Sequence, residues 1–256
     1  MPSQRDPDAN YFNATPAVRV VPVGPGRLCV VVDNALADPD GMVEWAAGQA
    51  FAPPRGIPYP GVVAEVPEAL ARQVGDCFAL HARSALGARR TQDVSIRLSL
   101  VTQSPVTLAP VQWQCHRDRI ADDPQQTLFA ASVLYRFRNR ALGGTSFYEP
   151  RLPAGQTDRL VADSRSLSAE QFSARYGLRA GYMRGSNPYF ERVASIGAEW
   201  NRMIFYDGGQ FHSADIDAAA GLPADPRIGR LTLNGFFACR RNAAAAGRLA
   251  PSPDRR

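Results

Sequence analysis

Residues 112–148 read QWQCHRDRIADDPQQTLFAASVLYRFRNRALGGTSFY, and this stretch decides the fold. His116 and Asp118 stand two positions apart near its start. Side chains two apart on a β-strand point to the same side, so these two can converge on one metal ion. Residues 127–137 and 144–148 follow as apolar segments of strand length, separated by polar and glycine-rich turns.

The same short-strand pattern continues on both sides of this stretch. In residues 94–100 (VSIRLSL) apolar and polar side chains alternate strictly, which is typical of a half-buried strand. We expect further strands at 112–115, 201–206 and 230–238. Many short strands with few helices between them indicate an antiparallel sandwich or barrel.

The first ninety residues mix strands and helices. Residues 19–33 read as two strands around a Gly-Pro-Gly turn. A helix is predicted from Asp38-Pro39-Asp40 onward, because proline is favoured at the first helical position. Residues 51–62 carry four prolines and must be extended. A second helix is predicted over 67–86, where apolar residues recur three and four apart.

Residues 149–199 interrupt the strand pattern. One helix is predicted at 168–176, where Ser168 is a good cap, and the remainder reads as polar loop. The segment fits a lid over a polar or anionic substrate, a plain surface loop or a dimer contact. Its interleaved aromatic and polar side chains are Tyr176, Arg179, Tyr182, Arg184, Asn187, Tyr189 and Arg192.

Composition excludes several classes of function. All 29 basic residues are arginine, so lysine Schiff-base chemistry is excluded. The net charge of +5 is dispersed along the chain, which argues against nucleic-acid binding. The four cysteines are scattered, as expected for reduced thiols rather than for disulfides or a zinc ribbon. No apolar run approaches the length of a membrane span, and the N-terminus lacks a signal-peptide pattern, so we expect a cytoplasmic protein.

The histidines narrow the choice of a third metal ligand. There are only three, and His81 lies on the apolar face of the second predicted helix, where a packed role is expected. His212 follows the strand at 201–206 and its Asp-Gly-Gly turn, so it can lie over a neighbouring strand end. We therefore predict that His116, Asp118 and His212 bind one metal ion.

A row of polar side chains follows on the strand at 230–238. Period-two alternation places Arg230, Thr232 and Asn234 on one face of that strand. A guanidinium grips a carboxylate in two parallel hydrogen bonds, so a dicarboxylate would satisfy this row.

The order His-x-Asp, long gap, His, short gap, Arg-x-Thr resembles the Fe(II)/2-oxoglutarate-dependent dioxygenase superfamily, in particular its prolyl-hydroxylase-like branch. The apolar strand at 128–135 and Gly143-Gly144 with Phe147 strengthen the resemblance, which covers residues 92–240. It implies a mainly β fold with flanking helices, whose core is a double-stranded β-helix (a cupin-like jelly roll).

The resemblance also implies roles for individual residues. His116, Asp118 and His212 would hold Fe(II), and Arg230 would pair with the distal carboxylate of 2-oxoglutarate, assisted by Thr232. Tyr135 would also reach this cosubstrate. With O2, such an enzyme releases succinate and CO2 and by default hydroxylates its substrate, here expected to be a small-molecule, amino-acid-like or peptidyl compound. The presence of Asp118 argues against halogenation, whose enzymes lack this carboxylate.

The expected domain organisation follows. Residues 1–17 would be a flexible leader and 18–240 a single dioxygenase domain, with supporting helices and strands over 18–91 and the jelly-roll core over 92–240, including the lid-like insertion 149–199. Residues 241–256 would be a disordered tail.

Two alternative functions stay open: a cupin-type metal enzyme that does not use 2-oxoglutarate, and a non-catalytic jelly-roll binding module. The sequence does not determine the oligomeric state.

Overall fold

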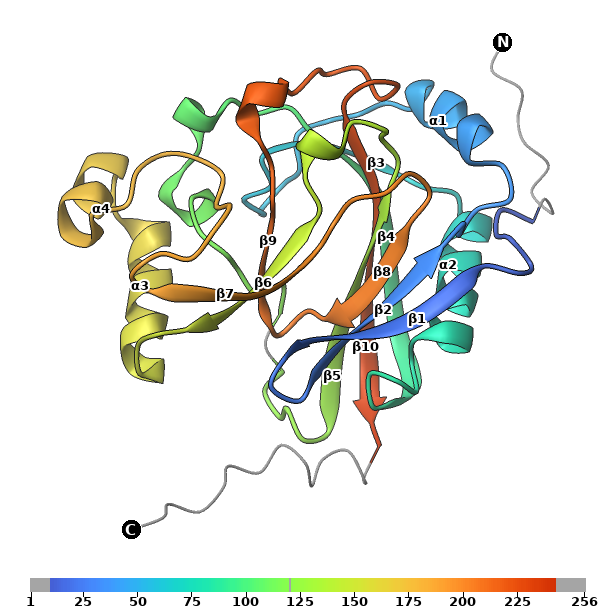
Figure 1. Ribbon diagram of the computed structural model, residues 1–256, viewed down its shortest axis with the longest axis horizontal. Helices are drawn as coiled ribbons and strands as arrows, with labels where there is room; N and C mark the ends of the chain where they lie inside the picture. Colours follow the sequence, from blue (N-terminus) through green and yellow to red (C-terminus); the bar gives the residue numbers. More distant parts are fainter. Residues whose placement is uncertain (1–9, 120, 243–256) are drawn as a thin grey trace.

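The computed structural model of the chain describes residues 10–119 and 121–242 (Figure 1). Its helices are α1 (Pro39–Ala47), α2 (Glu68–His81), α3 (Ala154–Ser166) and α4 (Ala169–Tyr176). Its strands are β1 (Ala17–Gly24), β2 (Arg27–Asp33), β3 (Gly61–Glu65), β4 (Ala88–Val101), β5 (Thr127–Tyr135), β6 (Thr145–Pro150), β7 (Phe190–Ile196), β8 (Met203–Asp207), β9 (Phe211–Ala214) and β10 (Arg230–Arg241).

The strands form two antiparallel sheets. The large sheet has the order β1-β2-β8-β5-β10-β4-β3, and the small sheet has the order β7-β6-β9. From β5 onward the chain passes repeatedly between them: β5, β8 and β10 join the large sheet, whereas β6, β7 and β9 join the small one. A chain that winds between two facing sheets in this way forms a jelly roll. The predicted fold class, mainly β with flanking helices around a double-stranded β-helix, is confirmed.

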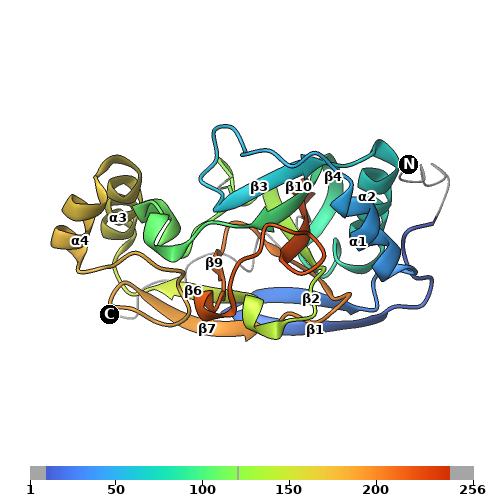
Figure 2. The ribbon, with the colours of Figure 1, turned by 90° about the horizontal axis from the view of Figure 1, so that it is seen from above.

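The outer face of the large sheet is covered by α1 and α2 (Figure 2). Side chains of β10 that point outward, Leu231 and Leu233, pack in one core with Leu70 and Phe78 of α2. The ring centroids of Phe78 and Phe237 lie 4.2 Å apart. This apolar layer keeps the large sheet from slipping, because a one-residue shift would move its polar row outward.

The inner face of the large sheet packs against the small sheet at one end only. Tyr135 and Ile204 from the large sheet contact Phe147 and Ile196 from the small one. Arg230, Thr232 and Asn234 share the inner face of β10, as their alternation predicted. The inner face therefore carries both an apolar cluster against the small sheet and a row of polar side chains.

The insertion has more structure than we predicted. The helix at 168–176 is confirmed as α4, with Ser168 accepting from the backbone amide of Gln171 and closing a capping box. The expected polar loop was wrong in two places, since 154–166 form α3 and 190–196 form β7 of the small sheet. Both helices lie at the opposite end of the molecule from α1 and α2 (Figures 1 and 2).

Other boundaries also differ from expectation. The strand predicted at 112–115 is absent among the described residues: 110–112 form a 3-10 turn, and only His116 makes an isolated bridge. The second helix ends at His81 rather than at residue 86, and β3 begins inside the proline-rich segment.

The chain ends differ from expectation as well. Tyr11, within the expected leader, is buried in the main core, while residues 1–9 lie outside the described part. Residue 241 closes β10, and residues 243–256 of the expected tail also lie outside it. No described helix has the length and apolarity that crossing a membrane requires.

Gly144 tests how tightly β6 and β7 are packed together in the small sheet. A Cβ at Gly144 would lie 2.0 Å from the carbonyl oxygen of Ile196, so Gly144→Ala must push β6 and β7 apart. We expect a loss of about 2–3 kcal/mol in the free energy of unfolding, as for other overpacked sites. Chemical denaturation would measure it. Gly155→Ala in α3, where no described atom lies within 4 Å of the added Cβ, should cost nothing; equal losses in both variants would contradict this account.

Candidate metal centre

One pair of backbone hydrogen bonds brings the three predicted ligands together. The amide of His116 donates to the carbonyl of His212, and the amide of His212 donates back, both at 2.9 Å. Two residues on, the amide of Asp118 donates to the carbonyl of Gly208 at 2.9 Å. The HxD segment is thereby attached to β9 and to the turn before it.

The ligand atoms converge as predicted. His116 Nε2 lies 3.5 Å from Asp118 Oδ1, and His212 Nε2 lies 3.4 Å from Asp118 Oδ2. All three donor atoms lie within 4.8 Å of one another. Two imidazoles and one carboxylate arranged on one side of an ion are the donor set of the facial triad that holds non-haem Fe(II) and leaves positions open. The side chains present therefore fit such an ion.

Neighbouring groups set the tautomer of His212 and shift the pKa values of Asp118 and His212. His212 Nδ1 lies 2.9 Å from the carbonyl of Gln210, which can only accept, so Nδ1 carries the proton and Nε2 faces the site. Burial alone would raise the pKa of Asp118, but His212 and His116 hold it well below its usual range. Burial lowers the pKa of His212, yet Asp118 outweighs this and the net shift is upward.

Gly208 makes room for the carboxylate. A Cβ at this position would lie 3.1 Å from Asp118 Oδ2 and 3.0 Å from the carbonyl oxygen of Phe129. The absence of a side chain in the turn thus lets the backbone of residue 208 approach Asp118. Tyr206, the last inward residue of β8, stands edge-on to the ring of His212 with centroids 4.8 Å apart.

The triad lies in the wall of a cavity of about 960 Å³. Arg230, Arg97 and Asn234 from the large sheet line the same cavity. Tyr59 comes from the proline-rich segment, and Tyr182 comes from the insertion. The size is ordinary for a site that takes small molecules.

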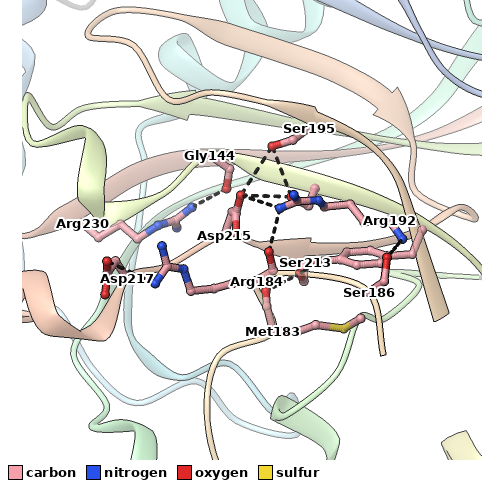
Figure 3. A network of polar contacts seen from close by, with 12 residues as sticks. Gly144, Met183, Arg184, Ser186, Arg192, Ser195, Ser213, Asp215, Asp217 and Arg230 are labelled. Atoms are coloured by element: carbon pink, nitrogen blue, oxygen red, sulfur yellow. Dashed lines mark hydrogen bonds and ion pairs between the residues drawn. The ribbon is translucent and has the colours of Figure 1, made fainter. Parts of the chain in front are cut away.

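Arg230 is buried in this wall and lacks a carboxylate partner among the described residues. Its Nε donates to the carbonyl of Leu142 at 2.7 Å, and its Nη2 lies 3.2 and 3.3 Å from the carbonyls of Gly143 and Gly144 (Figure 3). Burial lowers its pKa, an effect opposed by the tyrosines around it, Tyr59 first among them. A guanidinium in this setting stays charged and needs an anion.

Thr232 and Tyr135 lie beside Arg230 but behind the cavity wall. Thr232 Oγ1 donates to the carbonyl of Ser99 at 3.4 Å. The hydroxyl of Tyr135 lies 2.8 Å from Thr145 Oγ1, and Thr145 does line the cavity. The predicted contact of Thr232 and Tyr135 with a cosubstrate stays a prediction.

Polar contacts hold the stretch of the insertion that borders the cavity. Figure 3 shows Arg184 reaching Asp217, with Nη1 to Oδ2 at 3.1 Å, and Arg192 donating to the carbonyl of Arg184 at 2.7 Å. Ser213 of β9 donates to the carbonyl of Met183 at 3.2 Å. Met183 and Tyr182 are thus held in the cavity wall by the strand that carries His212.

Sequence reasoning did not single out two residues of the site. Tyr59 was passed over because its Pro-Tyr-Pro setting has no periodicity. Its hydroxyl is buried without a hydrogen-bond partner among the described residues, and burial raises its pKa to about 12. Tyr206 could have been found, because alternation along β8 places it on the inner face with Ile204.

A family model matches residues 14–237, nearly the whole described chain. The chain belongs to DUF6445, a family of unknown function. No curated protein matches the sequence.

Solved structures with similar folds include prolyl hydroxylases and a protein with 2-oxoglutarate bound. A prolyl-4-hydroxylase of Pseudomonas putida is 16% identical, with 80% of this chain and 88% of that chain covered and a TM-score of 0.38. HygX of Streptomyces hygroscopicus, with nickel and 2-oxoglutarate bound, is 10% identical over 82% of each chain, with a TM-score of 0.45. A prolyl hydroxylase of Trichoplax adhaerens, in complex with a peptide fragment of hypoxia inducible factor, is 8% identical over 87% of each chain, with a TM-score of 0.40. At these values the likeness does not assign an activity to this chain.

Metal binding is expected to stabilise the protein through the triad. Under anaerobic conditions, Fe(II) at about 100 times its Kd should raise the free energy of unfolding by about 2.7 kcal/mol, measured as a shift in the thermal midpoint. His212→Ala should remove the shift. His81→Ala, at the end of α2, should keep it, and a shift that survives in His212→Ala would place the metal elsewhere.

The affinity for Fe(II) should depend on pH. Both imidazoles must be unprotonated to bind, and the raised pKa of His212 means that a proton competes with the ion at higher pH than for a free histidine. The apparent affinity should therefore fall steadily as the pH is lowered from about 8 to about 6, the range in which histidine titrates. Calorimetric titration across that range measures it, and a flat profile would contradict the assigned ligands.

Proposed function

We propose that this protein is an Fe(II)- and 2-oxoglutarate-dependent dioxygenase that hydroxylates a small-molecule, amino-acid-like or peptidyl substrate and releases succinate and CO2. The observation that carries the proposal is Arg230: a buried guanidinium with no described ion pair, in the wall of the cavity that holds the triad. A metal triad and a separate cation in one cavity suit a compact dicarboxylate, which can chelate the ion at one end and pair with Arg230 at the other.

The residues of the chain have separate tasks in this proposal. His116, Asp118 and His212 would hold Fe(II), and Gln210 would keep the Nε2 of His212 turned toward it. When bound, Fe(II) with O2 would supply the oxidation that converts 2-oxoglutarate to succinate and CO2 and places an oxygen atom on the substrate. Arg230 would orient the cosubstrate, since its backbone contacts fix the plane of the guanidinium.

The tyrosines near Arg230 would add no negative charge that competes with the cosubstrate. Burial raises the pKa values of Tyr135, Tyr206 and Tyr182, so their phenols stay neutral around Arg230 and add no competing negative charge. The hydroxyl of Tyr182 is held by the carbonyl of Gln103 at 2.7 Å, which fixes its ring in the wall.

A second candidate is a metal-dependent enzyme of the cupin type that does not use 2-oxoglutarate. The hydrogen bonds of Arg230 to the backbone around Gly143 favour it, because they give this arginine a structural task. Release of succinate that depends on 2-oxoglutarate distinguishes the two candidates.

The visible charge-transfer band of an Fe(II)–2-oxoglutarate complex tests the proposal directly. We expect anaerobic addition of both to give the band, and Arg230→Gln to weaken 2-oxoglutarate binding by about 100-fold, as expected for the loss of a paired, charge-assisted contact of about 3 kcal/mol. Arg90→Gln, at an exposed position of β4, is the matched control and should bind normally. Absence of the band in the unchanged protein would rule the proposal out, and full affinity in Arg230→Gln would rule out the role of Arg230.

A further inference from the structure

A second arginine of the large sheet, Arg97, lines the cavity that holds the candidate triad. Arg97 lies on the inner face of β4, directly opposite Asn234 of β10 in the antiparallel ladder. Both side chains line the cavity. The guanidinium carbon of Arg97 stands 4.8 Å from the centroid of the Phe236 ring, which gives the group a fixed platform.

The polar atoms of this pair are unsatisfied. The Nε of Arg97 and the Oδ1 of Asn234 are buried and have no hydrogen-bond partner among the described residues. Asn234 Nδ2 donates to Ser99 Oγ at 3.3 Å, so a flipped amide would only exchange which atom is unpaired. Buried donors and acceptors rarely stay unpaired, and both side chains border the cavity, where a bound molecule could re-order them.

The charge of Arg97 is also uncompensated. It forms no ion pair among the described residues, and Asp93 of the same strand, which also lines the cavity, is exposed. Burial lowers its pKa, while Tyr59 and Asp118 oppose that shift. Glu65, opposite Arg97 on β3, is exposed and forms no ion pair with it among the described residues, so Asp118 is the carboxylate whose charge acts on Arg97 inside the cavity. A metal ion would occupy that carboxylate.

The charges in the filled site balance without Arg97, an inference that rests on the proposed function. The two positive charges of Fe(II) and the one of Arg230 would be matched by Asp118 and by the two carboxylates of 2-oxoglutarate. Arg97 would then be a partly buried cation left over beside a neutral centre. A buried charge without a partner is costly, so the remaining anion must come from another bound molecule.

We propose that Arg97 and Asn234 bind a carboxylate of the substrate, which makes the substrate a carboxylic acid such as an amino-acid-like compound or a peptide end. Two guanidinium nitrogens offer donors to the carboxylate oxygens, and Phe236 holds the guanidinium in plane. A flip of the Asn234 amide, in which Oδ1 accepts from the Ser99 hydroxyl, would free Nδ2 as a further donor. The carboxylate would thus be fixed on the metal side of the large sheet, separate from the one that pairs with Arg230.

Benzoate and benzamide test this site, because they share a shape and differ in charge. Protein loaded with Fe(II) and saturating 2-oxoglutarate is titrated anaerobically with each by calorimetry. We expect benzoate to bind at least about tenfold more tightly than benzamide, from its charge-assisted hydrogen bonds. Arg97→Gln should abolish that preference, whereas Arg90→Gln on the same strand should retain it.

Asn234→Asp provides a second test in which Arg97 stays in place. The new carboxylate lies opposite Arg97 and should neutralise it, so the preference for benzoate should also be lost. Equal binding of benzoate and benzamide to the unchanged protein, or no binding of benzoate, would overturn the proposal. So would an Arg97→Gln variant that weakens 2-oxoglutarate as much as Arg230→Gln does, because Arg97 would then belong to the cosubstrate.

Failure of the proposed function gives a different result. If 2-oxoglutarate does not bind the unchanged protein, the dioxygenase proposal fails whatever benzoate does. The preference for benzoate over benzamide, and its loss in Arg97→Gln, can still be measured in protein loaded with Fe(II) alone. A retained preference in that case supports the carboxylate site, and its absence overturns it.

Discussion

The site depends on two backbone hydrogen bonds between His116 and His212. They are a single isolated bridge, formed by residues nearly a hundred positions apart in the sequence. The segment before Asp118 is a 3-10 turn rather than a strand, so this bridge and the hydrogen bond from the Asp118 amide to the carbonyl of Gly208 are what place Asp118 beside His212. The jelly roll contributes the fixed side of the contact: β9 is bonded to β6 along its length, so the HxD segment attaches to a rigid edge.

The two faces of the large sheet have different roles: the outer face packs in the core, and the inner face lines the cavity. Its outward side chains pack under α1 and α2, and its inward side chains supply Arg97, Arg230 and Asn234 to the cavity. A strand in this position can keep buried polar groups because its other face is securely packed. The stability that the outer core supplies thus offsets the cost of burying Arg230 and half-burying Arg97 without an ion pair among the described residues.

Much of this arrangement could be predicted from the sequence. Strict alternation from Arg230 to Asn234 places three polar side chains on one face, and the scarcity of histidines leaves His212 as partner for His116. The fold class followed from many short strands. In these cases a local pattern reflects a global constraint, since one face of each strand is buried.

Other features had no local pattern to predict them. β7 was missed because it lies at the edge of the small sheet with most of its side chains exposed, which removes the apolar signal. The prediction of a strand at 112–115 was wrong. Trp113 and Cys115 are buried against α3, α4 and the insertion, and do not pair with a neighbouring strand. Tyr59 enters the cavity from a proline-rich segment whose path only tertiary contacts determine.

The three candidate ligands differ in their contact with solvent: the side chain of His116 is 52% exposed, and that of His212 is 5% exposed. This difference in exposure means that molecules in solution reach the candidate site from the His116 side. Chelators and incoming ions reach the His116 side first, while His212 and Asp118 are shielded by the sheets. Metal exchange should therefore begin by release of the His116 side chain, which can rotate away from the ion while its backbone stays bonded to His212.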